Sequence, residues 1–427
     1  MNTSEKNKYR PRVIDSRVEK YLKNFGAVCI EGPKWCGKTW TSSYHCKSEF
    51  MIGDPRNDFQ NRQLAELSPS VVLDGDTPRL LDEWQEVPSL WDAVRYTVDE
   101  RAEKGQFILT GSSTPKRKGI MHSGAGRIGK LRMRTMSLYE SGDSSGKVSL
   151  RELCNGKITP AVTGEVDLHS LIYYIIRGGW PGNLGVSPED AQLLPESYIA
   201  AILDDDAQRL DGKKYDKRKM RLLLCSLARN ESTTASNTKL LNDIKGFEDC
   251  SVDKDTVSDY LDVFDRLFLL DDQPAFSSNI RSSVRLKQSV KHHFCDPALA
   301  CALLKATPER LLNDLETLGF MFESLCVRDL KIYAESFGAN LFHYQDYQGR
   351  EVDAVIELDN GDWCAFEIKL GAKQIETAAQ NLVALRDSVA EKGGKAPSVL
   401  CVVCGMSSAA YVRPDGVFVV PVTALKD

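Results

Sequence analysis

The stretch Gly32-Pro33-Lys34-Trp35-Cys36-Gly37-Lys38-Thr39 decides how the rest of this sequence is interpreted. It has the G-x-x-x-x-G-K-T pattern of a phosphate-binding loop. Residues 27–30, just before it, are apolar and predict a buried strand, and residues 39–44 predict the start of a helix. Strand, loop and helix in this order are the context in which the pattern predicts nucleotide binding rather than an ordinary turn.

Each part of this loop has a physical task in holding phosphate. Gly32 and Gly37 let the backbone fold around phosphate oxygens where a side chain would collide. The first turn of the helix offers free N–H groups and the positive end of its dipole. Lys38 can reach the β- and γ-phosphates, and the hydroxyl of Thr39 can bind Mg²⁺. The predicted nucleotide-binding residues here are Gly32, Pro33, Lys34, Trp35, Cys36, Gly37, Lys38, Thr39 and Trp40.

The composition is that of a globular protein with more than one domain. The 427 residues exceed the size of most single domains. No run of about eighteen apolar residues occurs, so we expect no membrane span. The twelve cysteines are scattered through apolar segments, which favours a reduced, cytoplasmic protein. The net charge of −5 gives no overall basic field, so any contact with nucleic acid must come from a local patch.

An acidic strand end follows the loop at residues 79–84, Arg-Leu-Leu-Asp-Glu-Trp. An apolar strand that ends in two carboxylates downstream of a phosphate loop has the form of a Walker B segment. One carboxylate can hold the water shell of Mg²⁺, and the next can polarise an attacking water. We assign Asp82 to the metal and Glu83 to the water. Without the loop upstream, a solvated acidic turn would be the simpler interpretation.

Two further segments could sense or stabilise the γ-phosphate. Residues 106–110 predict a strand that runs into Ser112, a candidate sensor, although an ordinary polar strand end explains the pattern nearly as well. In residues 123–129, glycines surround Arg127 and would let its guanidinium swing onto the phosphate as an arginine finger. A plain exposed loop arginine is the alternative, and the sequence leaves open whether a finger would act within one chain or between chains.

At this point the sequence resembles the bacterial and archaeal AAA-type ATPases that carry a C-terminal nuclease-like domain of unknown function. The matching stretches are residues 32–39, 80–86, 108–113, 126–127 and 177–181, together with the C-terminal pattern below. The resemblance implies ATP as the nucleotide, and no guanine-specific N-K-x-D occurs. It also favours Arg127 as the finger. AAA proteins generally have Asn at the sensor position, where this chain has Ser112.

The predicted fold is an α/β multidomain architecture in four parts. A P-loop AAA-type ATPase domain with a parallel sheet spans residues 1–140. The polar break at residues 141–146 opens a linker and helical lid, 141–212. A winged-helix-like domain follows at 213–310, and a restriction-endonuclease-like α/β domain at 311–427.

The winged-helix-like part rests on three predicted helices, residues 218–230, 238–245 and 254–270. The outer face of the third helix carries several aspartates, which would repel phosphate, so we prefer a structural or protein-binding role for it. If DNA is touched here, we expect the basic segment that follows to touch it, although a solvated basic loop is the simpler interpretation. That segment contains Arg281, Arg285, Lys287, Lys291, His292 and His293.

The C-terminal part places an Asp on one predicted strand and E-x-K on the next, the PD-(D/E)xK pattern of restriction-endonuclease-like folds. Glu367 and Lys369 are two apart and must share a strand face. Asp353 joins that face only if it lies opposite Glu367, which requires a loop of odd length between the strands. Asp353 and Glu367 would then form a second Mg²⁺ site, with Lys369 steadying charge and Glu323 contributing from a predicted helix. A hairpin whose polar face is simply solvated is the alternative.

Cys401 and Cys404 are three apart on a predicted strand, so they should point to opposite faces as core residues.

The sequence therefore predicts an ATPase that binds ATP and Mg²⁺ and uses hydrolysis to rearrange its domains, acting on a DNA or protein partner, with an oligomer left open. Lys38, Glu83 and Arg127 are the predicted catalytic residues. Two alternatives stay open at this stage. One is an ATP-regulated DNA nuclease that uses Asp353, Glu367 and Lys369, and the other is a nucleotide switch without useful turnover.

Overall fold

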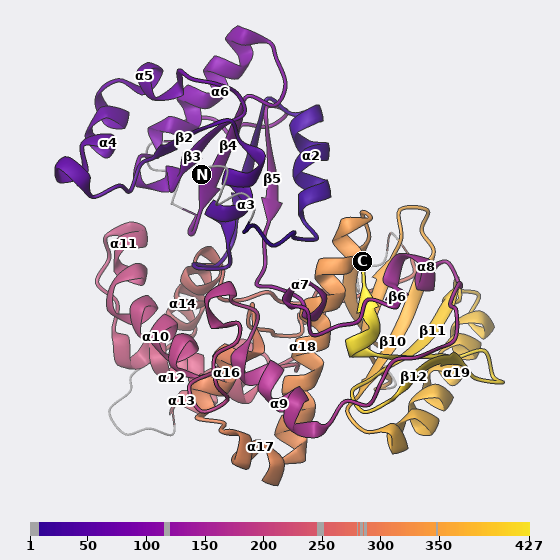
Figure 1. The fold of residues 1–427 in the computed structure, drawn as a ribbon. Helices are drawn as coiled ribbons and strands as arrows, with labels where there is room; N and C mark the ends of the chain where they lie inside the picture. Colours follow the sequence, from indigo (N-terminus) through magenta and orange to yellow (C-terminus); the bar gives the residue numbers. More distant parts are fainter. Residues whose placement is uncertain are drawn as a thin grey trace.

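The computed structural model describes residues 8–114, 120–245, 252–279, 281, 285, 288–346 and 349–427. The chain forms a parallel sheet in its N-terminal third, a group of helices in the middle and a second, larger sheet near the C-terminus (Figure 1). Lys287, one of the six residues of the predicted basic segment, lies outside the described residues.

The N-terminal sheet has five parallel strands in the order β2-β3-β4-β1-β5. Both of its faces are covered, so β1 (Ala27–Glu31) is apolar at consecutive positions. Ala27 and Cys29 face the core under α6, whereas Val28 and Ile30 face the core under α2. The predicted parallel-sheet domain is confirmed. The other strands are β2 (Ser48–Met51), β3 (Arg79–Asp82), β4 (Phe107–Gly111) and β5 (Ile128–Arg132).

Helix α6 packs on one face of this sheet and α2 on the other (Figure 1). The helices of this part are α2 (Asp15–Asn24), α3 (Lys38–His45), α4 (Arg56–Leu67), α5 (Pro69–Leu73), the 3₁₀ turn η1 (Trp84–Glu86) and α6 (Ser89–Arg101). The chain then leaves the sheet through the short helix α7 (Leu138–Ser141).

The middle of the chain is helical. Its elements are α9 (Leu168–Arg177), η2 (Pro181–Asn183), α10 (Leu193–Ala201), the π-helical turn η3 (Ile202–Asp206), α11 (Ala207–Asp211), α12 (Lys217–Arg229), α13 (Asn237–Lys245), α14 (Lys254–Arg266), α16 (Pro297–Leu304) and α17 (Pro308–Asn313). The three helices predicted for residues 218–270 correspond to α12, α13 and α14. Short antiparallel bridges follow them, Leu270 to Phe294 and Gln273 to Lys291. The winged-helix assignment itself stays a prediction.

Most described cations of the predicted basic segment are in internal contacts, whereas Arg281 is exposed. Lys291, His292 and His293 are 6%, 7% and 2% exposed, and each contacts a carboxylate. Arg285 is bound to Glu357, with a shortest distance of 2.7 Å. The expectation of a DNA-binding loop at these four residues is therefore wrong, because internal carboxylates already engage them.

The C-terminal sheet has seven strands in the order β7-β12-β13-β11-β10-β9-β8. The long helix α18 (Leu315–Ser336) packs on one face and α19 (Ile375–Glu391) on the other. Cys401 belongs to the core under α18 and Cys404 to the core under α19, as their spacing predicts. The strands are β7 (Ala161–Val162), β8 (Asn340–Gln345), β9 (Glu351–Glu357), β10 (Trp363–Lys369), β11 (Val399–Cys404), β12 (Ala409–Val412) and β13 (Phe418–Pro421), with the 3₁₀ turns η4 (Ala372–Gln374) and η5 (Val422–Ala424) nearby.

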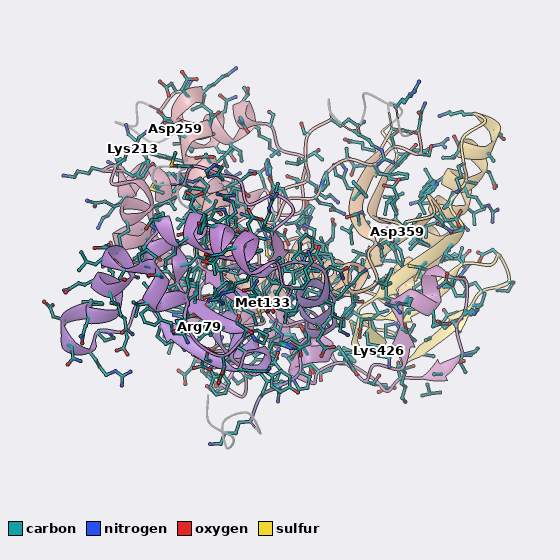
Figure 2. The ribbon with its side chains drawn as sticks, turned by 90° about the horizontal axis from the view of Figure 1, so that it is seen from above. Arg79, Met133, Lys213, Asp259, Asp359 and Lys426 are labelled. Atoms are coloured by element: carbon teal, nitrogen blue, oxygen red, sulfur yellow. The ribbon has the colours of Figure 1, made fainter. Side chains whose placement is uncertain are left out.

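Part of the segment after residue 141 lies on this C-terminal sheet. Strand β7 pairs with β12, and β6 (Val148–Ser149), which leads into α8 (Leu150–Cys154), pairs with β14 (Leu425–Lys426). From above, Lys426 and Asp359 mark the C-terminal part and Lys213 and Asp259 the middle helices, with Met133 between them (Figure 2). The segment predicted as linker and lid thus contributes both to the C-terminal sheet and to the helices.

Buried ion pairs join the three regions. Arg134, just after β5, contacts Asp271 of the middle segment at 2.5 Å and Glu335 of α18 at 2.8 Å. Within the described part of the chain, no helix combines the length and apolar character needed to cross a membrane.

Candidate functional site

The phosphate loop connects β1 to the N-terminus of α3, as the sequence predicts. Gly37 is the residue before the helix and has φ 104°, a conformation that favours glycine. Gly32 is needed for a different reason, since a Cβ there would lie 2.1 Å from the backbone oxygen of Met133. Both glycines are therefore required by the local backbone.

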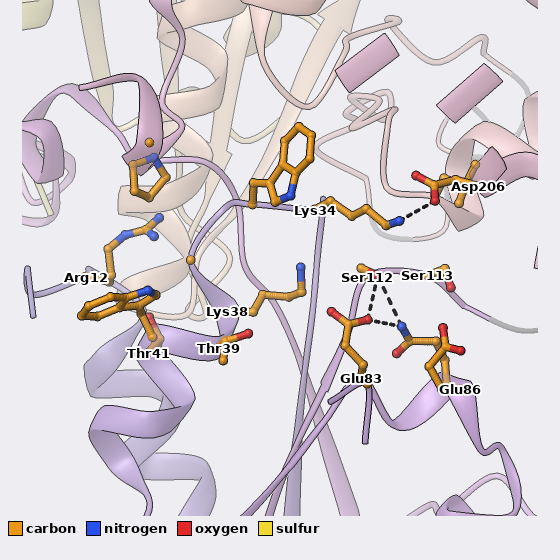
Figure 3. Close-up of a pocket in the computed structure, with 18 of the residues that line it drawn as sticks. Arg12, Lys34, Lys38, Thr39, Thr41, Glu83, Glu86, Ser112, Ser113 and Asp206 are labelled. Atoms are coloured by element: carbon orange, nitrogen blue, oxygen red, sulfur yellow. Dashed lines mark hydrogen bonds and ion pairs between the residues drawn. The ribbon is translucent and has the colours of Figure 1, made fainter. Parts of the chain in front are cut away.

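Lys38 lies under this loop and points into the pocket (Figure 3). It is 5% exposed, and its Nζ donates a hydrogen bond to the Pro33 carbonyl at 2.7 Å. The ammonium group is thus held beside the loop backbone, where a bound phosphate could replace the carbonyl as its acceptor.

Asp82 stands at the end of β3, and its carboxylate is hydrogen-bonded by hydroxyl groups. Its Oδ1 accepts hydrogen bonds from Thr39 at 2.9 Å and from Thr110 at 2.6 Å. Burial raises the pKa of Asp82 above its ordinary value, while the hydroxyl donors act in the opposite direction. A carboxylate next to the Thr39 hydroxyl is a donor set that suits Mg²⁺, so these residues fit the metal that the motif implies.

Glu83 follows in a left-handed backbone conformation, with φ 58°, which is uncommon for a residue with a side chain. Its backbone N–H donates to Thr110 Oγ1 at 3.0 Å. Its carboxylate accepts from Ser112 Oγ at 3.0 Å and from the amide of Gln85 (Figure 3). These contacts hold Glu83 at the pocket wall. They also mean that Ser112, the candidate sensor, is hydrogen-bonded to Glu83, the candidate base.

The middle helices brace the loop from the other side. Lys34 forms an ion pair with Asp206 of η3 (Figure 3). The Lys34 backbone N–H donates to the hydroxyl of Tyr198 at 3.2 Å, and its carbonyl accepts from Trp180 Nε1 at 3.2 Å. The side chain and the peptide groups of one loop residue are therefore held by three residues of the middle region.

Arg12 ties the loop to the end of β5. Its Nη1 donates to the Cys36 carbonyl at 2.8 Å, and its Nη2 donates to the Arg134 carbonyl at 3.0 Å. Its Nε forms a buried ion pair with Glu140 at 2.9 Å. The Arg12 guanidinium thus contacts both the phosphate loop and Arg134, which in turn contacts Asp271 of the middle segment.

These groups surround a pocket of about 1740 Å³. Trp35 and Trp40 flank it and are 52% and 49% exposed. The pocket is large enough for a nucleotide. Of the predicted residues, its walls contain Lys34, Trp35, Gly37, Lys38, Thr39, Trp40, Glu83 and Ser112.

Arg127 is not brought to this pocket. Its carbonyl accepts from the N–H of Ala27, at the start of β1, whereas the loop follows Glu31 at the other end of the strand. Four residues of a strand span about 13 Å. The guanidinium is half-exposed and contacts Asp99 at 2.8 Å. A finger role within the same chain is therefore wrong, and only a role toward a neighbouring subunit stays open.

Sequence reasoning missed several residues that shape the pocket: Arg12, Gln85, Thr110, Trp180, Tyr198 and Asp206. Thr110 could have been found, because it ends the strand beside the Walker B segment. Trp180 lies in the Arg177–Pro181 stretch that carried the family resemblance, without an assigned role. The contacts of Arg12, Tyr198 and Asp206 join distant parts of the chain and leave no local pattern.

The second predicted cluster assembles at the C-terminal sheet. Strands β9 and β10 are antiparallel and pair Phe366 with Ala354, and Glu367 and Asp353 are the next residues on the two strands. Five residues, 358–362, separate the strands, which is the odd length that the prediction requires. Lys369 Nζ lies 3.1 Å from Asp353 Oδ2 and 2.6 Å from Glu367 Oε2.

Glu323 of α18 joins this cluster together with a second lysine. Lys291 Nζ lies 2.5 Å from Glu323 Oε1 and 3.9 Å from Asp353 Oδ1. Burial raises the pKa of Glu323 to about 7, with Lys291 acting in the opposite direction. Burial and the neighbouring Asp353 likewise raise the pKa of Glu367 to about 7.

Comparison with known protein families divides the chain into three matched regions. Residues 24–141 match the model of the AAA domain. These residues form a P-loop AAA-type ATPase domain. The match supports ATP binding and hydrolysis as the activity of this AAA domain. Residues 168–310 and 318–425 match two domains of unknown function, DUF8612 and DUF4143 respectively.

Among curated proteins, the chain is similar to the uncharacterized proteins Rv2008c of Mycobacterium tuberculosis and Mb2031c of Mycobacterium bovis. Each is 24% identical over 358 residues, which is 83% of this chain and 72% of the relative. The aligned stretch is thus longer than the AAA domain.

Among solved structures, the Walker-type ATPase PABY2304 of Pyrococcus abyssi matches 70% of this chain and 97% of its own, with 12% identity and a TM-score of 0.42. The Aeropyrum pernix Orc1 protein, solved in complex with DNA, matches 72% of this chain and 93% of its own, with 13% identity and a TM-score of 0.22. Neither score is high enough to carry an argument about this chain.

Proposed function

We propose that this chain is a Mg²⁺-dependent ATPase in which hydrolysis moves the middle helices relative to the C-terminal sheet, in the service of a nucleic-acid or protein partner. The observation that carries the proposal is the hydrogen bond between Thr39 and Asp82. It joins the phosphate loop to the Walker B strand beside a pocket of nucleotide size. The AAA-domain match over residues 24–141 supports the same activity.

Each polar group of the pocket then has a distinct task. Lys38 binds the β- and γ-phosphate oxygens, and Thr39 with Asp82 would hold Mg²⁺, which when bound neutralises phosphate charge. Glu83 orients the attacking water and accepts its proton. Ser112 and Gln85 both donate to Glu83 Oε2, which keeps the carboxylate aimed into the pocket.

The proposed movement follows from the contacts of the loop. Lys34 is held by Asp206, Tyr198 and Trp180, so a change of loop conformation on phosphate binding acts directly on the middle helices. A second route runs through Arg12, which bonds both the loop and the backbone of Arg134. The Arg12 contacts are buried and the Lys34 contacts are partly buried, and contiguous contacts of this kind can carry coupling between distant sites.

Steady-state ATP hydrolysis by the purified chain with Mg²⁺ tests the proposal. We expect turnover in the wild-type chain and its loss in Lys38→Ala, because Lys38 is the ammonium group held against the loop backbone. Lys20→Ala is the matched control, since Lys20 is exposed on α2. No turnover in the wild-type chain, despite bound ATP, would favour the nucleotide switch, and no ATP binding at all would overturn the proposal.

The same assay addresses the partner. Double-stranded and single-stranded DNA are added in separate reactions, and stimulation of turnover by either would favour a nucleic-acid partner. Unchanged turnover with both would favour a protein partner. The acidic net charge and the buried basic segment favour the protein partner of the two.

An ATP-regulated nuclease is the second candidate function. The register that sets Asp353 opposite Glu367, with Lys369 in contact with both, favours it. Nicking of supercoiled plasmid by the chain with Mg²⁺ or Mn²⁺ and ATP, lost in Asp353→Ala, would support this function. Intact plasmid under all these conditions would count against this second function.

A further inference from the structure

The C-terminal acidic cluster already contains two cations of the chain itself. Three carboxylates, of Asp353, Glu367 and Glu323, meet the ammonium groups of Lys369 and Lys291. The side chains of Glu367 and Lys291 are 5% and 8% exposed, so solvent screens these charges weakly. Every carboxylate of the cluster lies within 4.0 Å of at least one ammonium nitrogen.

Lys291 differs from Lys369 in where it comes from. Lys369 belongs to β10, next to Glu367 on the same strand. Lys291 belongs to the middle region, and its backbone pairs in both directions with Gln273, with N···O distances of 2.8 and 2.9 Å. Gln273 Nε2 in turn donates to the backbone carbonyl of Asp353 at 3.0 Å. A separate segment of chain therefore inserts Lys291 among the carboxylates.

This arrangement does not fit a bound divalent metal. In the described ranges, no three His, Cys, Asp or Glu side chains are grouped so that they could hold a metal ion. The Lys291 ammonium lies within 4.0 Å of both Glu323 and Asp353, two of the oxygen ligands that a metal would need. A divalent ion beside this ammonium would be strongly repelled, because two like charges a few ångströms apart in a buried site are weakly screened.

Charge balance shows what Lys291 does instead. The three carboxylates and Lys369 sum to −2 when all are ionised, which is the charge that one divalent ion would neutralise. Lys291 supplies one of the two missing positive charges, from a side chain that cannot diffuse away. With all five groups ionised, Lys291 thus brings the net charge of the cluster from −2 to −1.

We propose that Lys291 is an internal cation that takes the place of a divalent metal ion at the C-terminal carboxylates, so that the residues present do not form a metal site. The inference rests on the metal role proposed above for Asp353 and Glu367, but it does not require that the site cleaves DNA. It assigns Lys291 as the residue that keeps the site closed to metal in this conformation.

Binding of Mn²⁺ to the full-length chain without nucleotide tests this proposal, followed by the electron paramagnetic resonance signal of free Mn²⁺. The variants are Lys291→Met, the double variant Lys291→Met/Asp353→Asn, and Lys373→Met as the control with an exposed lysine of the same region. We expect Lys291→Met to bind one Mn²⁺ at least about tenfold more tightly than the wild-type chain, because a repelling charge is gone. Asp353→Asn should abolish this gain, and Lys373→Met should behave as the wild-type chain.

Removing Lys291 leaves Glu323 without its partner, so a second variant guards against loss of folding. In Lys291→Met/Glu323→Gln both charges of the pair are gone, and Asp353 with Glu367 should still give tighter Mn²⁺ binding than in the wild-type chain. Thermal unfolding checks that each variant is folded. Equal Mn²⁺ binding by wild-type, Lys291→Met and Lys291→Met/Glu323→Gln chains would overturn the proposal.

The wild-type chain alone can also refute the idea. A tight Mn²⁺ site in that chain, removed by Asp353→Asn with Lys291 intact, would mean that the lysine and the metal bind together. ATP turnover and plasmid nicking are measured on the same preparations. Failure of either activity with the expected Mn²⁺ result would reject a proposed function and leave the role of Lys291 standing.

Discussion

The two acidic sites of this molecule are built from similar residues and compensate their charge differently. At the AAA-domain pocket, Asp82 is hydrogen-bonded by the hydroxyls of Thr39 and Thr110, which are neutral donors. At the C-terminal sheet, Asp353 lies within 4.0 Å of the ammonium groups of both Lys369 and Lys291. Neutral donors leave the negative charge available to an incoming cation, whereas lysines cancel it. Under the proposals above, the first site would accept a metal ion and the second would exclude one.

The two acidic sites also differ in how far their carboxylates are buried. At the AAA domain, Glu83 lines the large pocket, and Asp82 lies next to it through its hydrogen bond with the lining residue Thr39. The C-terminal carboxylates have little solvent around them, and burial raises the pKa of both Glu323 and Glu367 to about 7. A buried acidic cluster must obtain its counter-charge from the protein, and Lys291 provides it.

The largest effect is expected for Glu83→Gln. Glutamine keeps the size of the side chain but cannot accept a proton from water, so ATP turnover should fall about 100- to 1000-fold. ATP affinity, measured by calorimetry, should stay unchanged, because Lys38 and the loop backbone remain. Glu86→Gln is the control, since Glu86 also lines the pocket. The hydrogen bonds with Thr110 and Ser112 are made by Glu83.

Turnover of Glu83→Gln at the wild-type level would remove Glu83 from the catalytic step and weaken the contrast between the two sites. A loss of ATP affinity would mean that Glu83 contributes to binding instead. Either outcome can be separated from misfolding by comparing the thermal unfolding of the variant with that of Glu86→Gln.

The second expected effect concerns the stability of the closed site. Glu323→Gln removes the carboxylate nearest to the buried Lys291 ammonium and leaves Asp353, at 3.9 Å, as its remaining charged partner, so the free energy of unfolding should fall by about 2–3 kcal/mol. The loss should be smaller in a Lys291→Met background, where no cation is left without a partner. A thermodynamic cycle over the four chains, from denaturant unfolding, gives the coupling between the two residues.

If the effects of Glu323→Gln and Lys291→Met on the free energy of unfolding were additive, the Lys291–Glu323 ion pair would contribute nothing to stability. Packing alone would then hold Lys291 in the cluster. A wild-type-like stability of Glu323→Gln would lead to the same conclusion. Either result would remove the contrast between a paired C-terminal site and an unpaired AAA-domain site.

The parts of these sites that could be predicted are the parts written in local sequence. The phosphate loop and the Walker B strand each carry their residues within a few positions, so the two motifs alone indicate that Lys38, Thr39 and Asp82 lie together. Strand alternation puts Glu367 and Lys369 on one face, so the sequence could state which register of β9 and β10 would bring Asp353 to that face. The structure has that register.

The parts that could not be predicted depend on contacts between distant segments. Lys291 meets Glu323 and Asp353 across 32 and 62 positions, whereas its basic neighbours in the sequence predict an exposed loop. The glycines around Arg127 predict a finger, but the parallel pairing of β1 and β5 puts this residue at the wrong end of the sheet. Charge patterning marks where lysines occur, and only the tertiary fold decides whether a carboxylate lies beside them.

The smallest expected effect is that of Asp82→Asn on stability. Burial raises the pKa of Asp82, so between the unfolded value near 3.8 and the raised folded value the native state binds more protons than the unfolded state. Stability from this group is therefore complete below pH 3.8 and is lost as the pH rises through the folded pKa. Asparagine can still accept from Thr39 and Thr110, and it carries no charge. We expect the variant to be about 1 kcal/mol more stable than the wild-type chain at pH 7.

The difference in melting temperature between Asp82→Asn and the wild-type chain should shrink as the pH is lowered toward 4. Asp76→Asn, at an exposed aspartate of the same domain, should show no such trend. A destabilised Asp82→Asn at pH 7 would mean that a cation in this site already compensates the carboxylate. In that case a cation would compensate the carboxylates at both acidic sites, and the contrast between the two sites would be lost.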